Sequence, residues 1–307
     1  MGQKTNAQIF RLGIKKKIWE TKYIEKNLEE SSLYLYKTVE IQKYLNRFFA
    51  LYKIKVHNCK ISYSAKSLRI FISLYTTIKT IPMINKINTN KKKLFKIYDK
   101  FEIRKKNKKN IFSTQFSNKQ NFTLMEFQEF LLESLSIYTK KKVNIFVTFQ
   151  NLNDYKQLTY NQNLEFKNII KQLSKFSKNS FFKEALNLVI INISKRKSAK
   201  LLADFISDQF RLNQLKADQT TMSKKDNHFL GFLKLTIKLL ITSQISCITG
   251  IKIVIKGRFN KAPRAKSMII QFGKFSLQSL NEKIDYFQST AYTANGTFGI
   301  KVWICEN

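Results

Sequence analysis

The first part of the chain shows a helical pattern followed by two alternating runs. Between Thr38 and Lys53, apolar residues recur at helical spacing, which predicts an amphipathic helix packed on a core. Residues 59–63 and 68–74 then alternate with period two, and residues 64–67 between them form a turn-like run. A helix followed by a hairpin predicts the beginning of a small α+β domain.

Two stretches rich in lysine and asparagine interrupt this periodicity. Residues 77–110 contain basic runs at 91–93 and 104–109, a composition that repels itself when nothing is bound, and we interpret them as a basic insertion. A capping box formed by Thr123 and Glu126 predicts that the next helix begins there. A strand is predicted at 143–149. We interpret residues 151–197 as a second insertion, with one helix at 165–188.

The last third returns to a clear pattern of helices and then strands. Helices are predicted at 198–215 and 229–244, and a strand-rich terminal domain begins after Gly250. The predicted boundary between the two halves of the chain lies near residue 197. The alternating residues that predict the first and the closing strand of the terminal domain are Ile251, Ile253, Ile255, Ile300, Val302 and Ile304.

Charge identifies the kind of partner. The chain has 307 residues, of which 43% are hydrophobic, so it is long and apolar enough for more than one core. It carries 56 lysines and arginines against 20 acidic residues, a formal net charge of +36. Such self-repulsion favours a polyanionic partner, and nucleic acid is the first candidate. No stretch offers the roughly 20 predominantly apolar residues of a spanning helix, so we predict no membrane span.

Catalytic and metal-binding patterns are missing from the sequence. The cysteines Cys59, Cys247 and Cys305 are scattered, and the histidines are only His57 and His228, which is too few clustered ligands for a zinc site. There is no phosphate-binding loop and no nucleophile elbow. We therefore predict no enzyme activity and no cofactor, and we interpret Asp285 as a hydrogen-bond anchor.

The C-terminal segment carries a family resemblance. From Gly257-Arg258 through Ile284-Asp285-Tyr286 to Lys301-Val302-Trp303-Ile304, it resembles, in order and approximate spacing, the KH-domain protein of the small ribosomal subunit, the S-three family. Three further segments resemble that family: Met1-Gly2-Gln3-Lys4 with Arg11-Leu12-Gly13-Ile14 at the opening, Ala65-Lys66-Ser67-Leu68-Arg69-Ile70 in the hairpin, and Ala199-Lys200-Leu201-Leu202-Ala203-Asp204 in the first helix after the KH domain.

The resemblance implies a fold and a division into domains. The expected fold class is α+β, with an N-terminal KH-type (type II) α/β domain that carries insertions, followed by a C-terminal domain of helices and an antiparallel sheet. Residues 1–30 would form an RNA-contacting tail and 31–150 the KH-like domain with its basic insertion at 77–110. Residues 151–197 would be the second insertion, and 198–307 the C-terminal ribosomal-protein domain.

The resemblance also implies RNA contacts, because lysine and arginine neutralise phosphates and exposed aromatic rings stack on bases. Lys234 and Lys238, one helical turn apart, lie near where the family presents basic residues to messenger RNA (mRNA) that enters the ribosome; a merely solvated lysine face is the alternative. The residues expected to bind ribosomal RNA (rRNA) are Gly2, Gln3, Lys4, Arg11, Lys66, Arg69, Arg258, Arg264, Lys266, Lys274 and Tyr292.

One departure from the family concerns the KH signature, a GxxG loop whose glycines let backbone amides approach phosphates. No glycine occurs between Gly13 and Gly231. Counting back from the helix predicted at Thr123 places Asn118, Lys119, Gln120 and Asn121 where that loop should be. Asparagine tolerates left-handed backbone conformations, so we expect a degenerate KH loop whose shape survives.

The expected role is that of a structural constituent of the small ribosomal subunit. It would bind rRNA in the head, line the channel where mRNA enters, and contact neighbouring head proteins. Heavy use of lysine, asparagine, isoleucine and phenylalanine is typical of AT-rich coding, which favours an organelle-encoded protein of the mitochondrial matrix, with the plastid as the alternative. Residues 1–19 are basic and without acid, so a cleaved presequence is another interpretation, which the family-like opening disfavours.

Two other classes of protein share parts of this composition. An organelle-encoded intron maturase, homing endonuclease or other splicing factor would also be basic, but a nuclease needs clustered carboxylates for metal ions, and no paired acidic motif is present. A peripheral membrane protein held by lysines would need an amphipathic anchoring helix with interfacial tryptophan. RNA recovered by crosslinking separates the first class from a ribosomal protein, and flotation with liposomes tests the second.

Overall fold

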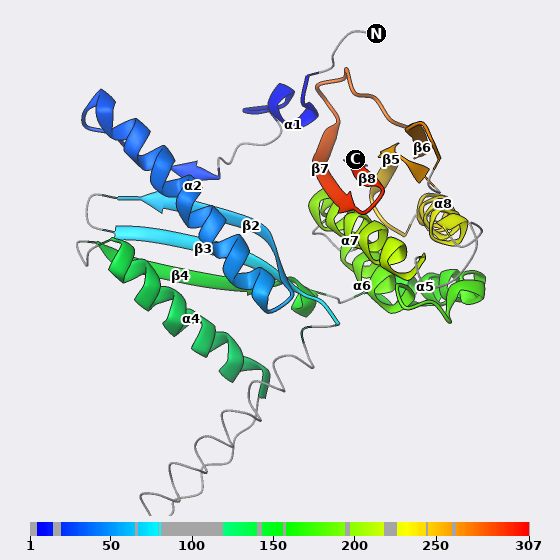
Figure 1. The fold of residues 1–307 in the computed structure, drawn as a ribbon, viewed down its shortest axis with the longest axis horizontal. Coiled ribbons are helices and arrows are strands. Elements are labelled where there is room, and N and C mark those ends of the chain that lie inside the picture. The colour runs from blue at the N-terminus through cyan, green and yellow to red at the C-terminus, as the bar shows by residue number, and fades with distance from the viewer. Residues whose placement is uncertain are drawn as a thin grey trace, which may run out of the picture. The chain divides into compact units, whose positions relative to one another are not determined.

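The chain forms two compact units in the computed structural model (Figure 1). The structure describes residues 5–14, 20–64, 67–78, 80, 119–139, 143–155, 158–193, 197–217, 226–243, 245–259 and 262–306. One unit is Trp19–Asn151; the other combines Met1–Ile18 with Leu152–Asn307. The predicted boundary near residue 197 therefore differs from the observed one at Leu152, because the helices between 152 and 197 pack into the C-terminal unit.

The unit Trp19–Asn151 is a four-stranded sheet covered on one face by two helices (Figure 1). The strand order is β1-β2-β3-β4; β1 and β2 are parallel, β2 and β3 antiparallel, and β3 and β4 parallel. Its elements are β1 (Thr21–Lys22), α2 (Leu28–Leu51), β2 (Ile54–Tyr63), β3 (Ser67–Thr76), α4 (Lys119–Tyr138) and β4 (Asn144–Asn151).

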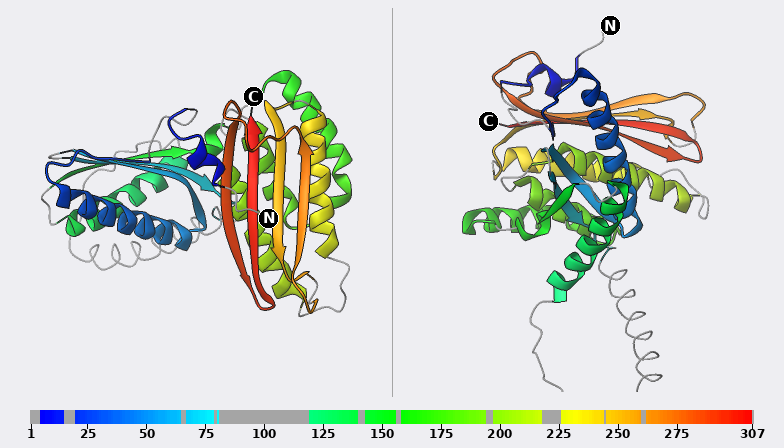
Figure 2. Two further views of the ribbon diagram at one scale, coloured as in Figure 1. Left: turned by 90° about the horizontal axis from the view of Figure 1, so that it is seen from above. Right: turned by 90° about the vertical axis from the view of Figure 1, so that its left-hand side faces the viewer.

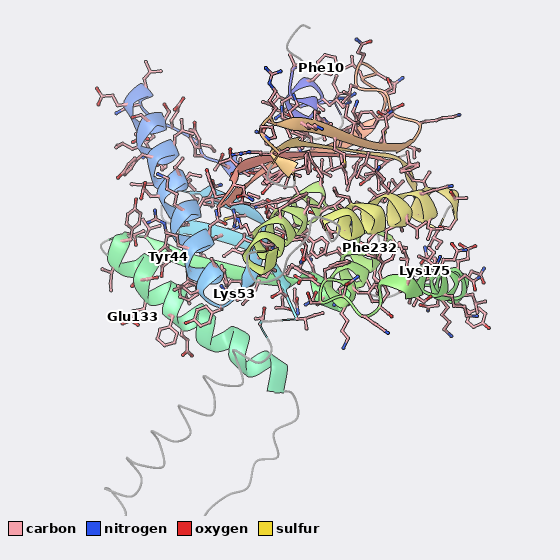
Figure 3. All side chains as sticks on the ribbon, turned by 45° about the vertical axis from the view of Figure 1, so that its right-hand side comes forward. Phe10, Tyr44, Lys53, Glu133, Lys175 and Phe232 are labelled. Atoms are coloured by element: carbon pink, nitrogen blue, oxygen red, sulfur yellow. The ribbon has the colours of Figure 1, made fainter. Side chains whose placement is uncertain are left out.

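The core of this unit lies between the sheet and the two helices. Ile41, Leu45 and Phe49 of α2 are buried, which confirms the predicted apolar face, although the helix begins at Leu28 rather than near Thr38. The predicted hairpin and the strand near 143–149 are confirmed as β2, β3 and β4. The hydroxyl of Tyr44, labelled in Figure 3, donates a 2.8 Å hydrogen bond to Ser134 and so joins α2 to α4.

The second unit contains an antiparallel sheet in the order β6-β5-β8-β7. The predicted strands that begin at Gly250 and close at Ile304 are confirmed. Its elements are α1 (Ala7–Phe10), η1 (Leu152–Tyr155), α5 (Tyr160–Gln172), η2 (Ser174–Phe176), α6 (Phe182–Ile193), α7 (Ala199–Ala217), α8 (Asp226–Thr242), β5 (Ile248–Gly257), β6 (Lys266–Gly273), β7 (Lys283–Thr293) and β8 (Gly296–Glu306).

Helices α7 and α8 cover one face of this sheet, which we call the inner face. Alternate residues of β5 and β8, including Ile253, Ile300 and Val302, turn to it and are completely buried. Phenylalanine rings fill the layer above them: Phe232 of α8, labelled in Figure 3, packs edge-on against the ring of Phe182. The antiparallel sheet with helices on one side confirms an α+β architecture for the C-terminal part.

The single helix predicted at 165–188 is wrong. The structure has two helices there, α5 and α6, separated by the short helix η2 and the polar run 177–180. Leu173 and Phe181 at the two sides of this break are buried. Because both helices must turn an apolar face to the same core, the chain bends at the polar run, and periodicity alone did not reveal that bend.

Candidate nucleic-acid interface

The basic residues predicted in the terminal domain lie at two ends of its sheet. In the β5–β6 register, Gly257 pairs with Lys266 at one end and Gly250 pairs with Gly273 at the other. At about 3.3 Å per residue, the eight residues of β6 separate these ends by about 23 Å. Arg258, Arg264 and Lys266 therefore share one end, which we call the loop end, whereas Lys274 lies at the opposite end.

The loop end presents exposed cations on a backbone held by its own side chains. Arg258, Arg264 and Lys266 are all exposed. The Arg258 Nε donates a 2.5 Å hydrogen bond to the Ala262 carbonyl and thereby closes the turn. The ring of Phe259 packs edge-on against buried Phe298, which anchors the same turn to the core. The loop end can therefore present positive charge to phosphates beside a turn that Phe259 anchors to the core.

Tyr292 lies at the loop end as well. It is near the end of β7, pairs with Thr297 across the β7–β8 hairpin and is 68% exposed. An exposed ring beside cations has the geometry needed to stack on a base.

Arg11 corrects a prediction. It was expected to bind rRNA, but its side chain is only 2% exposed. Its guanidinium donates hydrogen bonds to the carbonyls of Ala7, Leu277 and Ser279 at 3.0, 2.9 and 2.5 Å, with a weaker one to Ser276 at 3.4 Å. Arginine donors fit such a ring of carbonyls, so Arg11 fixes the N-terminal segment to the loop before β7 instead of facing RNA.

Asp285 connects three segments, as its interpretation as a hydrogen-bond anchor predicted. Its carboxylate accepts a 2.6 Å hydrogen bond from the Gln8 side chain and a 2.7 Å bond from the backbone N–H of Ala199. Ala199 is the first residue of α7, where a carboxylate is favoured by the helix dipole and satisfies an orphan donor. The N-terminal segment, β7 and α7 are thus joined at one side chain.

Lys234 and Lys238 are exposed on α8. Phe232, Leu233 and Ile237, which stand where further basic residues were expected, are buried instead. The helix therefore uses one face for the core and offers the two lysines on the other. This arrangement suits both contact with phosphates and a solvated face.

The other predicted contacts are only partly visible. Arg69 on β3 is exposed, whereas Gly2, Gln3, Lys4, Lys66 and Asn118 lie outside the described residues. The predicted KH loop needs a correction, because the backbone of Lys119, Gln120 and Asn121 is the first turn of α4 rather than a loop. No glycine or proline stands in this run to end a helix, so α4 begins before the capping box predicted at Thr123.

Other chemistry finds little support within the described part of the chain. It holds no group of three or more histidine, cysteine and acidic side chains that could bind a metal ion. Among its helices, none combines the length and apolar character that crossing a membrane requires. Burial raises the pKa of the Cys305 thiol to about 11, so this cysteine is a neutral core residue at physiological pH.

Sequence reasoning missed three lysines, Lys252, Lys256 and Lys301, on the sheet face opposite the helices. Each alternates with buried residues of β5 or β8 and is paired across the sheet in a regular register. The period-two alternation of these lysines with apolar residues was visible in the sequence. It did not reveal that β5 and β8 are neighbouring strands.

Comparison with known proteins shows which proteins this chain is similar to. A family model described as "Ribosomal protein S3, C-terminal domain" matches residues 231–304. The chain is 32% identical over 168 residues to "Small ribosomal subunit protein uS3c" of Euglena longa, covering 53% of this chain and 71% of that protein. It is 35% identical over 137 residues to the uS3c protein of Cyanidium caldarium, covering 44% of this chain and 58% of that one.

A bacterial relative gives a similar result. "Small ribosomal subunit protein uS3" of Dictyoglomus turgidum is 29% identical over 141 residues, or 46% of this chain and 49% of that protein. The family model covers the part of the C-terminal unit that contains the paired strands β7 and β8 and the anchor residue Asp285. With 71% of the Euglena longa protein covered at 32% identity, the chain belongs to the ribosomal protein S3 family.

Proposed function

We propose that this protein is a structural, RNA-binding constituent of the small subunit of an organellar ribosome. The observation that carries the proposal is the exposed loop end, with Arg258, Arg264 and Lys266, inside the segment that the S3 family model covers. On a chain of net charge +36, such cations release counterions when they meet phosphates, which favours binding to RNA. The partner at the loop end is rRNA of the subunit head.

Assembly into the small subunit tests this proposal. Tagged chains that carry Arg264→Gln and Lys266→Gln should sediment with small subunits at a reduced level, because two phosphate contacts are lost while the hydrogen bond from Arg258 to Ala262 keeps the turn closed. The matched control, Lys167→Gln with Lys171→Gln on exposed positions of α5, removes the same charge. Equal incorporation of both variants would contradict the assignment of the loop end.

We further propose that Lys234 and Lys238 contact mRNA where it enters the ribosome. Both lysines lie on the exposed face of α8, opposite its buried apolar residues. Their amino groups can contact phosphates, which positions a message but does not recognise its sequence. Replacing both by glutamine should slow translation of structured messages more than unstructured ones. An equal effect on both kinds of message would refute this role.

The unit Trp19–Asn151 is proposed to be the KH-like domain, with basic residues of 77–110 as an insertion. Its support is the order helix, antiparallel hairpin, helix and a fourth strand parallel to β3, on a sheet covered on one face. With the backbone of Lys119–Asn121 helical and no glycine nearby, contact of closely approaching backbone amides with RNA phosphates is not expected at this position.

The organelle is proposed from composition and relatives together. Lysine- and asparagine-rich coding favours an organellar genome, and relatives carry the name uS3c. The mitochondrial matrix stays our prediction, with the plastid as the alternative; neighbouring head proteins complete the expected partners. Fractionation of organelles followed by immunodetection on small subunits distinguishes the two. No observation favours an enzyme or an intron maturase.

A further inference from the structure

The sheet of the C-terminal unit has a second face, turned away from α7 and α8, which we call the outer face. Figure 2, left, looks onto this sheet with the helices behind it. The register of the four strands places these side chains on the outer face: Lys252, Val254 and Lys256 of β5; Ser267, Ile269 and Gln271 of β6; Tyr286, Gln288, Thr290 and Tyr292 of β7; Thr297, Gly299, Lys301 and Trp303 of β8.

Most of the outer face is open to solvent. Lys256, Gln288 and Thr290 are exposed, and Ile269 is 59% exposed. The N-terminal segment and the loop before β7 cover one end of the face, where Ala7 packs with Ile284 and Cys305. Phe275 and Leu277 of that loop pack against the same cluster, as do the half-buried outer-face residues Tyr286 and Trp303. The remainder of the face has no protein layer over it within the described part of the chain.

The charge on the outer face has a single sign. Among the fourteen residues given above, three are lysines and none is acidic. Three acidic groups near the face are engaged by neighbours: Asp285 turns to the inner face and binds Ala199, Glu306 forms an ion pair with Lys283, and Glu282 accepts hydrogen bonds from the Ser276 N–H and the Cys305 thiol. An uncovered face with cations and no carboxylates is complementary to a polyanion.

The lysines form a short diagonal track. Lys252 and Lys256 are four residues apart on β5, a separation of about 13 Å at about 3.3 Å per residue. Lys301 lies on the neighbouring strand β8, opposite Val254 and so midway between them. The track therefore holds three amino groups in a row, and that of Lys252 lies 5.6 Å from the centre of the Phe275 ring. Their spacing fits an extended polyanion rather than a compact anion.

Aromatic rings stand at both ends of the track. At one end the half-buried rings of Trp303 and Tyr286 are cross-strand neighbours with centroids 5.1 Å apart and planes tilted by 34°, and Phe275 packs edge-on against Trp303. At the other end lies Tyr292, six residues from Tyr286 on the same strand, or about 20 Å away. Cations in the middle and rings at the ends combine phosphate contact with base stacking, the two interactions that hold single-stranded nucleic acid.

We propose that the outer face binds a single strand of RNA. The strand's phosphates contact Lys252, Lys301 and Lys256, and bases stack on the Tyr286–Trp303 pair and on Tyr292. The proposal rests on the RNA-binding function inferred above but names a different surface, because Lys234 and Lys238 lie on α8, on the other side of the sheet. RNA is favoured over a protein partner because the only exposed large aliphatic side chain here is Ile269.

Binding of the full chain to a labelled oligouridine of about twelve nucleotides tests the proposal by fluorescence anisotropy. The test variant combines Lys252→Gln, Lys256→Gln and Lys301→Gln. Its affinity should fall at least about tenfold, and the slope of log affinity against log salt should decrease by about 2, since each single-strand phosphate contact contributes about 0.7. The control variant combines Lys167→Gln, Lys171→Gln and Lys175→Gln, three exposed lysines of the same unit, and should bind as the unaltered chain does.

Stacking gives an independent signal. The chain has two tryptophans, Trp19 and Trp303, so Trp19→Phe leaves Trp303 as the reporter. Oligouridine should quench its fluorescence, and it should do so less in the triple lysine variant at the same concentration. The far-ultraviolet spectrum and the denaturation midpoint of the triple variant should match those of the control, which excludes loss of folding as the cause.

The outcomes separate this proposal from the general function. Equal affinity losses in the test and control variants, or an unquenched Trp303, would overturn the outer-face site. If at the same time the loop-end variant still fails to join small subunits, the ribosomal function stands while the outer-face proposal is rejected. Crosslinks from a photoreactive group at the exposed position 288, opposite Lys301, that reach only protein in assembled subunits would also overturn it, in favour of a protein partner.

Discussion

Gly257 shows at the scale of one residue how tightly the loop end is built. A Cβ placed on Gly257 would lie 2.2 Å from the Phe298 ring, which is itself buried and stacked on Phe210 with centroids 4.9 Å apart. Phe259 also packs edge-on against this ring, so the ring is held by neighbours that resist its displacement. The glycine that opens the family-like segment is therefore needed for close approach to an aromatic core.

We expect Gly257→Ala to lower the free energy of unfolding by about 1–3 kcal/mol, the range typical of overpacking. Urea denaturation measures it. Gly231→Ala on α8 is the matched control, since its added Cβ meets nothing within 4 Å, and it should stabilise the chain by about 0.5–1 kcal/mol through helix propensity. Similar effects of both changes would contradict the packing argument.

Arg11 is a second residue whose role differs from its apparent type. We expect Arg11→Met to cost about 2–4 kcal/mol, because the carbonyls of Ala7, Leu277 and Ser279 lose a donor while they stay partly or fully buried. Chemical denaturation gives the change, and faster proteolysis before β7 should accompany it. Arg69→Met at an exposed site should change stability by no more than about 0.5 kcal/mol.

Cys305 gives a prediction on pH. Burial raises the pKa of its thiol from 9.0 to about 11. Since the folded-state pKa is the higher one, the stabilisation from keeping the thiol neutral is present below about pH 9 and is lost as the pH rises through about 11. Stability of the unaltered chain should therefore fall more steeply over this range than that of Cys305→Ser. At about pH 8, iodoacetamide should label exposed Cys247 and spare Cys305.

The N-terminus of α7 is held by two side chains, one next to the helix and one from β7. Ser198 caps α7 by accepting a hydrogen bond from Leu201 N–H, while Asp285 receives Ala199 N–H from outside the helix. Asp285→Ala should lower stability by about 1–3 kcal/mol and free the N-terminal segment as well, because Gln8 loses its acceptor. Loss of stability without faster proteolysis of residues 5–14 would show that the segment is held without Asp285.

Asp208→Asn provides the comparison for Asp285. Asp208 lies on α7. Its carboxylate forms an ion pair with Arg211 at 3.8 Å, and both side chains are about two-fifths exposed. Such exposed pairs contribute little, so the expected change is below about 1 kcal/mol.

Elements with one dominant periodicity were predictable from the sequence, and those shaped by tertiary contacts were not. The hairpin β2–β3 and the strands β5 and β8 alternate cleanly, so their positions followed from the pattern. The beginning of α2 was missed because Leu33, Leu35 and Tyr36 are apolar but do not follow the spacing of one helix face. In the structure these three side chains are exposed. The break between α5 and α6 was missed because its anchors Leu173 and Phe181 continue the helical spacing.

The candidate sites divide in the same way. Lys234, Lys238 and Arg258, which the family resemblance singled out, are exposed, and their contact with RNA stays a prediction. The burial of Arg11 could not be foreseen, because it depends on carbonyls more than 260 positions away along the chain. Likewise, the separation of Lys274 from Arg264 follows only from the register of β5 with β6.

The charge of the whole molecule sets its behaviour without a partner. A net charge of +36 on 307 residues destabilises the compact state through self-repulsion, and salt screens such repulsion. We therefore expect the thermal denaturation midpoint of the free chain to rise by several degrees when the salt concentration increases from about 0.05 M to about 0.5 M. Light scattering recorded in the same scan separates this effect from aggregation.

A polyanion should reproduce the salt effect at low ionic strength, because it binds the folded chain and neutralises many cations at once. Adding oligouridine at low salt should raise the midpoint further in the unaltered chain than in the chain with Lys252, Lys256 and Lys301 changed to glutamine. Both chains should respond alike to simple salt, since three charges of the +36 change the global repulsion little. A midpoint that falls with added salt would show that attractive ion pairs, rather than repulsion, dominate the folded state.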